Sequence, residues 1–284
     1  MNVTFIAEIS SNHNRELNRC LALIDAAAKI GCAAVKFQLF QVQKLFAPEI
    51  LAQSEAHRQR KAWELPIEFL PALVARCNEV DIQFACTPFY LAAVEELLPY
   101  VDFYKIASYE ILWYDLLIAC ASTGKPVVLS TGMATLDEVQ QAVAVLRRAG
   151  CKDLTLLHCI SGYPAPSDEC NLRAIETLRQ ACDCPVGWSD HSRNAGVVFR
   201  AVHRWGATMV EFHLDLEGKG EEYPTGHCWL PKQIKAVIKA VQKGFQADGS
   251  GKKMPMPSEL GDINWRADPA DGLRPLLKMR EKWK

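Results

Sequence analysis

The sequence has no long hydrophobic run, no excess of charge of one sign and no pair of cysteines at C-x-x-C spacing. No apolar stretch approaches the ~20 residues that a membrane-spanning helix needs. The amino-terminal sequence MNVTFIAEIS lacks the basic and apolar regions of a signal peptide. The formal net charge is −1, and no basic run is long enough to bind the phosphates of a nucleic acid. We therefore expect neither a membrane nor a nucleic acid as partner.

The eleven cysteines stand mostly within apolar helix or strand patterns. Disulfide frameworks are typical of small secreted chains, so we expect reduced, buried thiols in a cytoplasmic protein. Cys182 and Cys184 form a C-x-C pair, which by itself is a weak signal for zinc, and we interpret both as packing residues.

Short apolar runs alternate with helical patterns along most of the chain. Eight runs have the length of buried strands: 3–8, 33–38, 82–87, 102–108, 126–132, 154–159, 185–191 and 208–213. Helical spacing of apolar residues follows nearly every run, as in 135–149, 171–181, 195–205 and 231–245. This alternation predicts an α/β fold with a parallel sheet. Eight units favour a closed (β/α)8 TIM barrel over an open sheet, and no G-x-G-x-x-G motif follows the first run.

We expect residues 1–248 to form this single-domain barrel and residues 249–284 to form a short C-terminal tail packed on it. Glycine, proline and charged residues dominate the sequence after residue 248. The longest insertion, 39–65, lies between the second strand and its helix. Long insertions of this kind are often functional lids.

Polar side chains stand at the carboxyl ends of all eight predicted strands, where barrel enzymes carry their active sites. They are Glu8, Lys36, Gln38, Thr87, Lys105, Ser108, Glu110, Ser130, Thr131, His158, Ser189, Asp190, His191, Glu211 and His213. A buried lysine needs a counter-charge. An anion bound between Lys36 and Lys105 is one interpretation, and pairing with Glu8 or Glu211 is the other.

Two histidines, His191 and His213, end consecutive strands that are neighbours in a closed barrel. Each histidine taken alone is more often structural. As a pair in the barrel mouth they favour one shared divalent ion. A tetrahedral structural zinc site is not indicated, because third and fourth ligands at standard spacing are missing.

Eight segments of the chain resemble the N-acetylneuraminate (sialic acid) synthase family. They are AEISSNHN, AVKFQLF, CTPF, FYKIAS, GKPVVLSTGMATLDEV, LLHCISGYPAP, NLRAIETL and PVGWSDH. The resemblance implies a (β/α)8 transferase that condenses phosphoenolpyruvate with an N-acylated hexosamine aldehyde. The products would be a nine-carbon, sialic-acid-like 3-deoxy-ulosonic acid and phosphate.

The resemblance also implies roles for single residues. The positions that match phosphoenolpyruvate-binding residues are Lys36, Thr87, Lys105, Ser108 and Ser189, and Ser161 stands where the family commonly has an asparagine on the same ligand. His191 and His213 match ligands of Mn²⁺ or Mg²⁺. The acceptor side is matched by Glu8, Glu110 and Tyr163, with Gln38 beside the site. The implied catalytic group is Glu8, Lys36, Lys105 and Glu110, with Glu8 as the candidate for proton transfer.

The chain departs from the family after the eighth strand. A family Pro-Gly-Pro-Asp segment, whose aspartate contacts the sugar, is replaced by GKGEEYPTGHCW, in which Glu221 or Glu222 is the candidate substitute. Residues 249–284 do not match the family's C-terminal antifreeze-like domain, which supplies an arginine to the partner subunit's site. We therefore expect the catalytic barrel only, with Arg266 or Arg274 of the tail contributing to an altered acceptor pocket.

Two other functions stay open at this point. A heptulosonate- or octulosonate-type synthase would need a further phosphate grip, and no surplus arginine cluster follows the strands. A non-catalytic sugar-binding barrel would not require the lysines and histidines together. The sequence leaves open the aldose, the native metal and whether the chain forms a homo-oligomer.

Overall fold

The structure is a computed structural model that describes residues 3–283. The chain divides into two compact units, Met1–Phe245 and Gln246–Lys284. The first contains the whole barrel, and the second corresponds closely to the predicted tail. Within the described residues, no helix combines the length and the apolar character that a membrane crossing requires.

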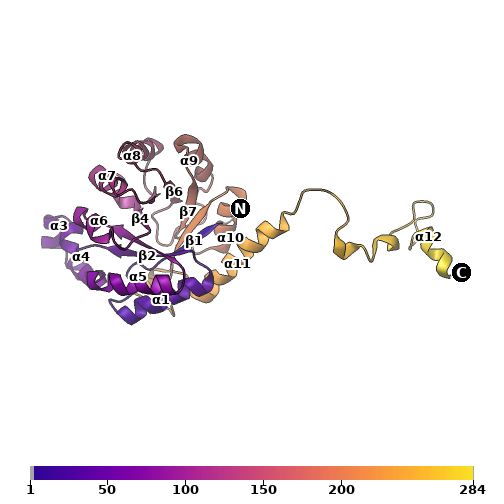
Figure 1. Cartoon of the computed structure of the whole chain (residues 1–284), viewed down its shortest axis with the longest axis horizontal. Helices are drawn as coiled ribbons and strands as arrows, with labels where there is room; N and C mark the ends of the chain where they lie inside the picture. Colours follow the sequence, from indigo (N-terminus) through magenta and orange to yellow (C-terminus); the bar gives the residue numbers. More distant parts are fainter. Residues whose placement is uncertain (1–2, 284) are drawn as a thin grey trace. The chain divides into compact units, whose positions relative to one another are not determined.

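Eight parallel strands close a barrel in chain order, with β8 paired back onto β1 (Figure 1). The strands are β1 (Thr4–Glu8), β2 (Ala34–Leu39), β3 (Gln83–Pro88), β4 (Phe103–Ile106), β5 (Val127–Ser130), β6 (Leu154–Cys159), β7 (Val186–Asp190) and β8 (Met209–His213). Each lies within, or within one residue of, a run predicted from the sequence. The predicted (β/α)8 barrel is therefore confirmed.

Helices surround these strands (Figure 1). They are α1 (Leu17–Ile30), α5 (Leu70–Glu79), α6 (Leu91–Leu97), α7 (Tyr114–Ser122), α8 (Leu136–Arg148), α9 (Ala174–Cys182), α10 (Ala195–Phe199), which continues as a π-helical turn over Arg200–Arg204, and α11 (Pro231–Ala247). Local signals set their ends. Gly31 ends α1 in the left-handed conformation, and Thr135 and Glu138 form a capping box at the start of α8.

The long insertion after β2 is helical rather than structureless. It contains α2 (Val42–Leu45), α3 (Pro48–Gln53), α4 (Glu55–Gln59) and a 3-10 turn over Arg60–Trp63. Two side-chain bonds tie it down: Glu64 accepts from the Val42 N–H at 2.7 Å, and Arg15 donates to the Lys61 carbonyl at 2.8 Å. Its role as a lid stays a prediction.

The barrel interior is built in layers, because alternate residues of each strand point inward. The lower layer is apolar and consists of Ile6, Ala34, Ala85, Phe103, Val128 and Leu157, with Met209 packed against them. Gly187 completes it on β7, where an added Cβ would lie 2.4 Å from the Met209 carbonyl oxygen and 2.6 Å from Leu157 Cδ2. Two residues further along the strands, the same faces present Glu8, Lys36, Thr87, Lys105, Ser130, Cys159, Ser189 and Glu211.

His158 is on the other face of its strand. Its Nε2 lies 2.9 Å from the Cys170 carbonyl, and its ring packs 5.4 Å from that of Trp188. Since Leu157 belongs to the inner layer, the alternation directs Cys159 inward and His158 toward the helices. The polar group that β6 contributes to the interior is therefore a thiol, whereas the sequence pattern had drawn attention to the histidine.

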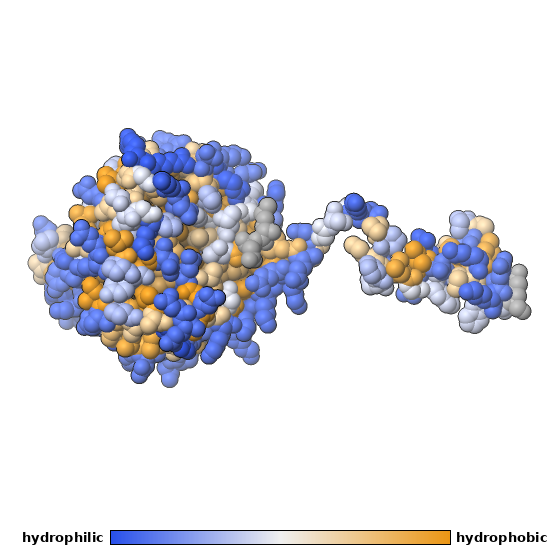
Figure 2. Space-filling model, viewed as in Figure 1, coloured by the Kyte–Doolittle hydropathy of each residue, from blue (hydrophilic) through white to orange (hydrophobic). Residues whose placement is uncertain are grey.

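The second unit has little regular structure apart from α12 (Leu277–Arg280) and 3-10 turns over Pro257–Glu259, Ile263–Trp265 and Glu281–Trp283. Asp268 accepts from the Leu277 N–H at 2.7 Å, and Arg280 pairs with Asp271. Apolar side chains are exposed on this unit (Figure 2), among them Met254, Met256, Leu260, Trp265, Leu273, Leu277 and Trp283. Packing of the tail on the barrel stays a prediction.

Candidate active site at the barrel mouth

The two buried lysines share two buried carboxylates. Glu8 and Lys36 are partners in the β1–β2 register, and their side chains form an ion pair. Glu211 Oε1 lies 3.5 Å from Lys36 Nζ and 3.6 Å from Lys105 Nζ. Of the two interpretations of these lysines, pairing with Glu8 and Glu211 is therefore confirmed. An anion between them stays a proposal.

The positive charges of Lys36 and Lys105 are not equally balanced by neighbouring carboxylates. Burial disfavours a charged lysine, but at Lys36 the nearby Glu211 and Glu8 outweigh burial and raise the pKa above its ordinary value. At Lys105 burial prevails and lowers the pKa, although Glu211 opposes the shift. The only other close contact of Lys105 Nζ among the described residues is the Ile106 carbonyl at 3.3 Å. An incoming anion would therefore find its least neutralised cation at Lys105.

Hydroxyl groups gather around Gly132, beyond the end of β5. The Gly132 N–H donates to Ser108 Oγ at 2.9 Å, and Ser161 Oγ is buried without a hydrogen-bond partner within residues 3–283. A Cβ on Gly132 would lie 2.4 Å from Ser161 Oγ and 2.9 Å from Ser108 Oγ. Cys159 Sγ lies 3.5 Å from Ser108 Oγ. Burial raises the pKa of the Cys159 thiol, and the charge of Lys105 opposes that shift. We call Ser108, Gly132 and Ser161 the hydroxyl cradle.

The remaining predicted phosphoenolpyruvate residues lie on the lysine network. Thr87 Oγ1 accepts from Lys36 Nζ at 3.3 Å, and Ser189 donates to Glu211 Oε1 at 3.4 Å. Both side chains are buried. Each therefore hydrogen-bonds a charged group of the lysine network.

Glu8 is held by three donors. Its Oε1 accepts from the Ser10 N–H at 2.7 Å and from Gln38 Nε2 at 3.0 Å, while its Oε2 meets Lys36. A carboxylate so placed is oriented as an acceptor. The structure thus brings Gln38, predicted beside the site, into direct contact with Glu8.

Glu110 is the more isolated acid. It lies on the turn Ser108–Glu110 that follows β4, and its Oε2 is buried without a hydrogen-bond partner in the described part of the chain. Burial raises the pKa of Glu110 to about 7, and Lys105 only partly offsets that shift. This carboxyl group can therefore both give and take a proton near neutral pH.

The two predicted metal ligands lie together, with further aromatic rings around them. The ring centroids of His191 and His213 are 5.2 Å apart, and the tilted ring of Tyr163 lies 4.2 Å from that of His191. A third imidazole, His227, lies 4.5 Å from His213. No sequence pattern marks His227, because it directly follows no predicted strand and belongs to no alternating pattern.

The hydrogen bonds of His191 and His213 leave one nitrogen of each ring for a metal. His191 Nδ1 is 2.7 Å from the Ile160 carbonyl, and His213 Nδ1 is 2.8 Å from Glu222 Oε2. Both partners are acceptors, so each Nδ1 carries the proton and each Nε2 keeps its lone pair. Burial lowers the pKa of both histidines, which keeps them neutral at pH 7. This donor set fits a divalent ion.

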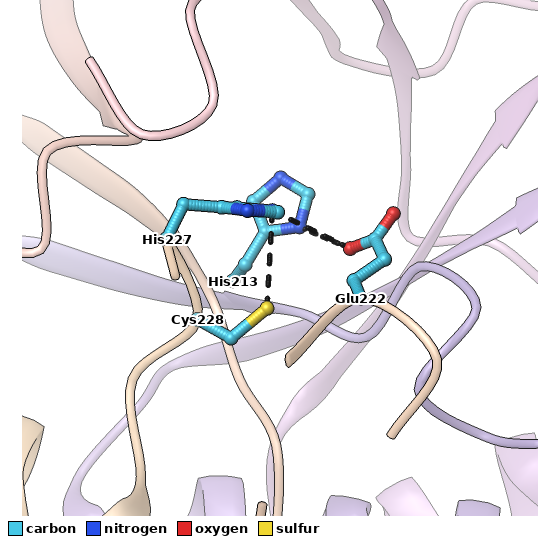
Figure 3. Close-up of side chains that lie close together, drawn as sticks. All are labelled: His213, Glu222, His227 and Cys228. Atoms are coloured by element: carbon cyan, nitrogen blue, oxygen red, sulfur yellow. Dashed lines mark hydrogen bonds and ion pairs between the residues drawn. The ribbon is translucent and has the colours of Figure 1, made fainter. Parts of the chain in front are cut away.

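The loop after β8 supplies the rest of the cluster. His213, Glu222, His227 and Cys228 each present a donor atom, and these atoms all lie within 4.8 Å of one another (Figure 3). Burial favours a protonated Glu222, but His213 holds its pKa well below the ordinary value. Glu221 is exposed, so Glu222 is the acidic residue of this loop that faces the site.

Buried hydrogen bonds fix the loop on both sides. Asn12 donates to the Leu214 carbonyl at 3.0 Å and accepts from the Glu222 N–H at 2.9 Å. Asp190 accepts from Trp188 Nε1 at 3.1 Å and from Trp229 Nε1 at 2.9 Å. Asp190 therefore does not face a ligand. It ties the end of β7, next to His191, to the end of the loop that carries His227.

Comparisons with known proteins identify relatives of the whole barrel. The chain is 38% identical over 257 residues to an uncharacterized protein of Methanocaldococcus jannaschii, covering 89% of this chain and 74% of that protein. It is 36% identical over 273 residues to N,N'-diacetyllegionaminic acid synthase of Campylobacter jejuni, covering 91% and 81%. A crystal structure of N-acetylneuraminic acid (sialic acid) synthetase from Leptospira borgpetersenii in complex with citrate has a TM-score of 0.81 and 31% identity over 95% of this chain and 93% of that chain.

These likenesses confirm the resemblance read from the sequence motifs. A truncated 3-deoxy-D-arabino-heptulosonate 7-phosphate synthase from Thermotoga maritima, 15% identical with a TM-score of 0.69, shares the fold. Residues 23–253 match the NeuB family, and the chain therefore belongs to this family of sialic-acid-synthase-type enzymes.

Proposed function

We propose that the protein condenses phosphoenolpyruvate with an aldose, forming a nonulosonic acid and releasing phosphate. The observation that carries the proposal is the meeting, in one barrel mouth, of an incompletely neutralised lysine with a hydroxyl cradle and a cluster of neutral imidazoles. The lysine and the hydroxyl cradle suit an anion, and the imidazole cluster suits a metal-bound carbonyl. The legionaminic and sialic acid synthases named above are relatives of this chain.

Phosphoenolpyruvate would bind over Lys105 and the cradle. Ser108 accepts from the Gly132 N–H, so its own hydroxyl proton, which now lies near Cys159 Sγ, can be donated to an anion. The buried Ser161 hydroxyl is a second donor at the same place. Lys36, Thr87 and Ser189 would orient the ligand from the neighbouring strands. These groups stabilise the negative charge that develops on the departing phosphate.

The reaction joins the methylene carbon of phosphoenolpyruvate to the aldehyde carbon, adds water at the enol carbon and breaks the bond from that carbon to the phosphate oxygen. A divalent ion held by His191 and His213 would polarise the aldehyde oxygen. Glu110, with a pKa of about 7, would give a proton to that oxygen. Glu8, oriented by Ser10, Gln38 and Lys36, would accept the proton of the adding water.

The acceptor would lie on the side of Tyr163, Gln38 and Glu222. An N-acylated hexosamine or a close relative is the proposed aldose, and Glu222 takes the place of the aspartate that the family carries in this loop. The tail, with Arg266 and Arg274, is proposed to complete the acceptor pocket. Assembly as a homo-oligomer belongs to the proposal, and so does a cytoplasmic location, since ten of the eleven free cysteines are buried thiols.

Phosphate release from phosphoenolpyruvate tests the proposal. We expect release only when an aldose is present, with Mn²⁺ added back to chelator-treated protein, and with N-acetylmannosamine or another N-acylated aldose among the best acceptors. Release only with phosphorylated aldoses would favour the heptulosonate type instead. No release with any aldose and any divalent metal would contradict the proposal and favour a non-catalytic barrel.

A further inference from the structure

We propose that His227 is a third protein ligand of the ion held by His191 and His213. The centre would then bind through three imidazole nitrogens and prefer Co²⁺, Zn²⁺ or Mn²⁺ to Mg²⁺. The inference rests on the proposed function only for the presence of an ion at this place. The positions, hydrogen bonds and burial of the three rings support His227 as a ligand.

The three rings are spaced as ligands of one ion would be. A metal–nitrogen bond of about 2.1 Å places the centroid of an imidazole roughly 3.2 Å from the ion. The centroids of His213 and His227 are 4.5 Å apart, those of His191 and His213 are 5.2 Å apart, and those of His191 and His227 are 6.2 Å apart. With that bond length the three distances correspond to ligand angles of about 90°, 110° and 150° at a common centre. The centroid distances are therefore compatible with a single ion, and the donor atoms of His213 and His227 lie within 4.8 Å of each other.

The hydrogen bonds of His227 orient it as they orient the other two histidines. Thr225 donates its hydroxyl proton to the Glu222 carbonyl at 2.6 Å, so its oxygen can only accept from His227 Nδ1, which is 2.5 Å away. His227 Nδ1 is therefore protonated and Nε2 keeps its lone pair. In all three rings the proton lies on Nδ1 and points to a neighbouring oxygen, which is the usual arrangement around a metal.

The lone pair of His227 faces the Glu222 carboxylate and the Cys228 thiol. Nε2 is 3.6 Å from Glu222 Oε2 and 3.8 Å from Cys228 Sγ (Figure 3). A neutral nitrogen facing a carboxylate at that distance gains nothing without a cation nearby. Glu222 already accepts from His213 and Ser10, so we assign it to orient His213. Cys228 accepts from Asn12 at 3.5 Å and is assigned no bond to the ion.

A centre with three imidazoles selects its metal by ligand type. Mg²⁺ prefers oxygen ligands and keeps several waters. Imidazole suits zinc, copper, iron and nickel, and affinity at a given site rises from Mn²⁺ through Fe²⁺ to Co²⁺. We therefore expect Co²⁺ and Zn²⁺ to bind more tightly than Mn²⁺, and Mg²⁺ to bind least tightly.

The test is a Co²⁺ titration of chelator-treated full-length protein without phosphoenolpyruvate. Calorimetry and the visible absorption of Co²⁺ detect the binding. We expect one ion per chain and a loss of affinity of more than ~100-fold in His227→Gln, since even outer-shell partners of metal ligands contribute 10–100-fold. His203→Gln is the matched control, because His203 is exposed and packs near Phe245. Far-ultraviolet circular dichroism checks that both variants are folded.

Two results would overturn the inference. One is Co²⁺ affinity within threefold of the unmodified protein in His227→Gln. The other is a sulfur-to-cobalt charge-transfer band that Cys228→Ser removes while His227→Gln keeps the ion. Phosphate release with unchanged metal binding in His227→Gln would remove the third ligand and keep the proposed function. If His227→Gln loses metal binding while the unmodified protein releases no phosphate with any aldose, the third ligand would be supported and the proposed function contradicted.

Discussion

Two successive layers of the same barrel interior differ completely in chemistry. The lower layer, which includes Ile6, Phe103 and Leu157, is apolar and filled by side-chain volume. The upper layer, one inward step along the strands, includes Glu8, Lys36, Lys105 and Glu211 and is held by ion pairs. The strands do not change between the layers. Only the residue type changes from one inward position to the next. The apolar layer and the charged layer are therefore only about 7 Å apart along the strands.

The two layers should also differ in what they contribute to stability. Buried apolar side chains stabilise the fold in proportion to their area. Buried ion pairs often contribute little, because the cost of desolvating the charges offsets their attraction. Changes in the lower layer should therefore weaken the fold, whereas changes in the upper layer should weaken ligand binding.

The largest expected effect is on stability, from Leu157→Ala in the lower layer. Leu157 is fully buried, and a cavity at such a position costs about 2–5 kcal/mol in the free energy of unfolding. Denaturant unfolding measures the loss, and calorimetry should give an unchanged Kd for phosphoenolpyruvate. A Kd that rises in step with the loss of stability would mean that the layers are not separable.

Lys105→Met should do the opposite in the upper layer. We expect the affinity for phosphoenolpyruvate to fall by at least ~100-fold, about 2.7 kcal/mol, because the least neutralised cation of the mouth is removed. Calorimetry measures the change, and Lys29→Met on the exposed face of α1 is the control. Equal affinities in both variants would place the anion elsewhere.

Glu110→Gln should separate stability from catalysis through pH. The folded-state pKa of Glu110 is about 7, above the ordinary value of 4.5. Its favourable contribution is full below pH 4.5 and is lost as the pH rises to about 7, because the unfolded chain ionises first. Above pH 7 the buried carboxylate then costs up to about 3 kcal/mol.

The variant removes this cost and should be more stable than the unmodified protein at pH 8, with no gain at pH 4. Thermal unfolding at both values measures the difference. Activity should fall at all pH values if Glu110 transfers a proton. A variant that is equally stable at pH 8 would show that Glu110 is not buried as a charged group.

The smallest effect is expected from removal of residues 249–284. The barrel is a compact unit by itself, so its unfolding temperature should change little. The KM for the aldose should rise about tenfold, in line with the loss of a buried hydrogen bond worth roughly 1–3 kcal/mol. Steady-state kinetics with several aldoses measures it, and sedimentation shows whether assembly changes. An unchanged KM for every aldose would remove the tail from the acceptor pocket.

The sequence predicted the barrel because its signals are local and repeated. Each strand is a short apolar run, each is followed by helical spacing, and caps such as Gly31 and Thr135 mark the ends. The positions of Lys36, Lys105, His191 and His213 followed from the same alternation. They meet in one mouth because the sheet closes into a barrel, which brings the carboxyl ends of the strands together.

The rest of the site was beyond that reasoning. His227 and Cys228 lie on an irregular loop whose path is set by Asn12 and Asp190, contacts that are distant in the sequence. The importance of Gly132 depends on how closely Ser108 and Ser161 approach it, which no spacing reveals. The roles assigned to Glu8, Glu110, Gln38 and Tyr163 still rest on the resemblance.

The bond from Trp229 to Asp190 has an optical consequence. Two buried indoles, Trp188 and Trp229, donate to one carboxylate that directly precedes His191. An ion bound to the His191 ring would change the electric field at both chromophores, while Trp265 and Trp283 of the tail are 48% and 77% exposed and should emit at longer wavelength. If the proposed centre binds an ion, the blue edge of the intrinsic fluorescence would report its binding without any label.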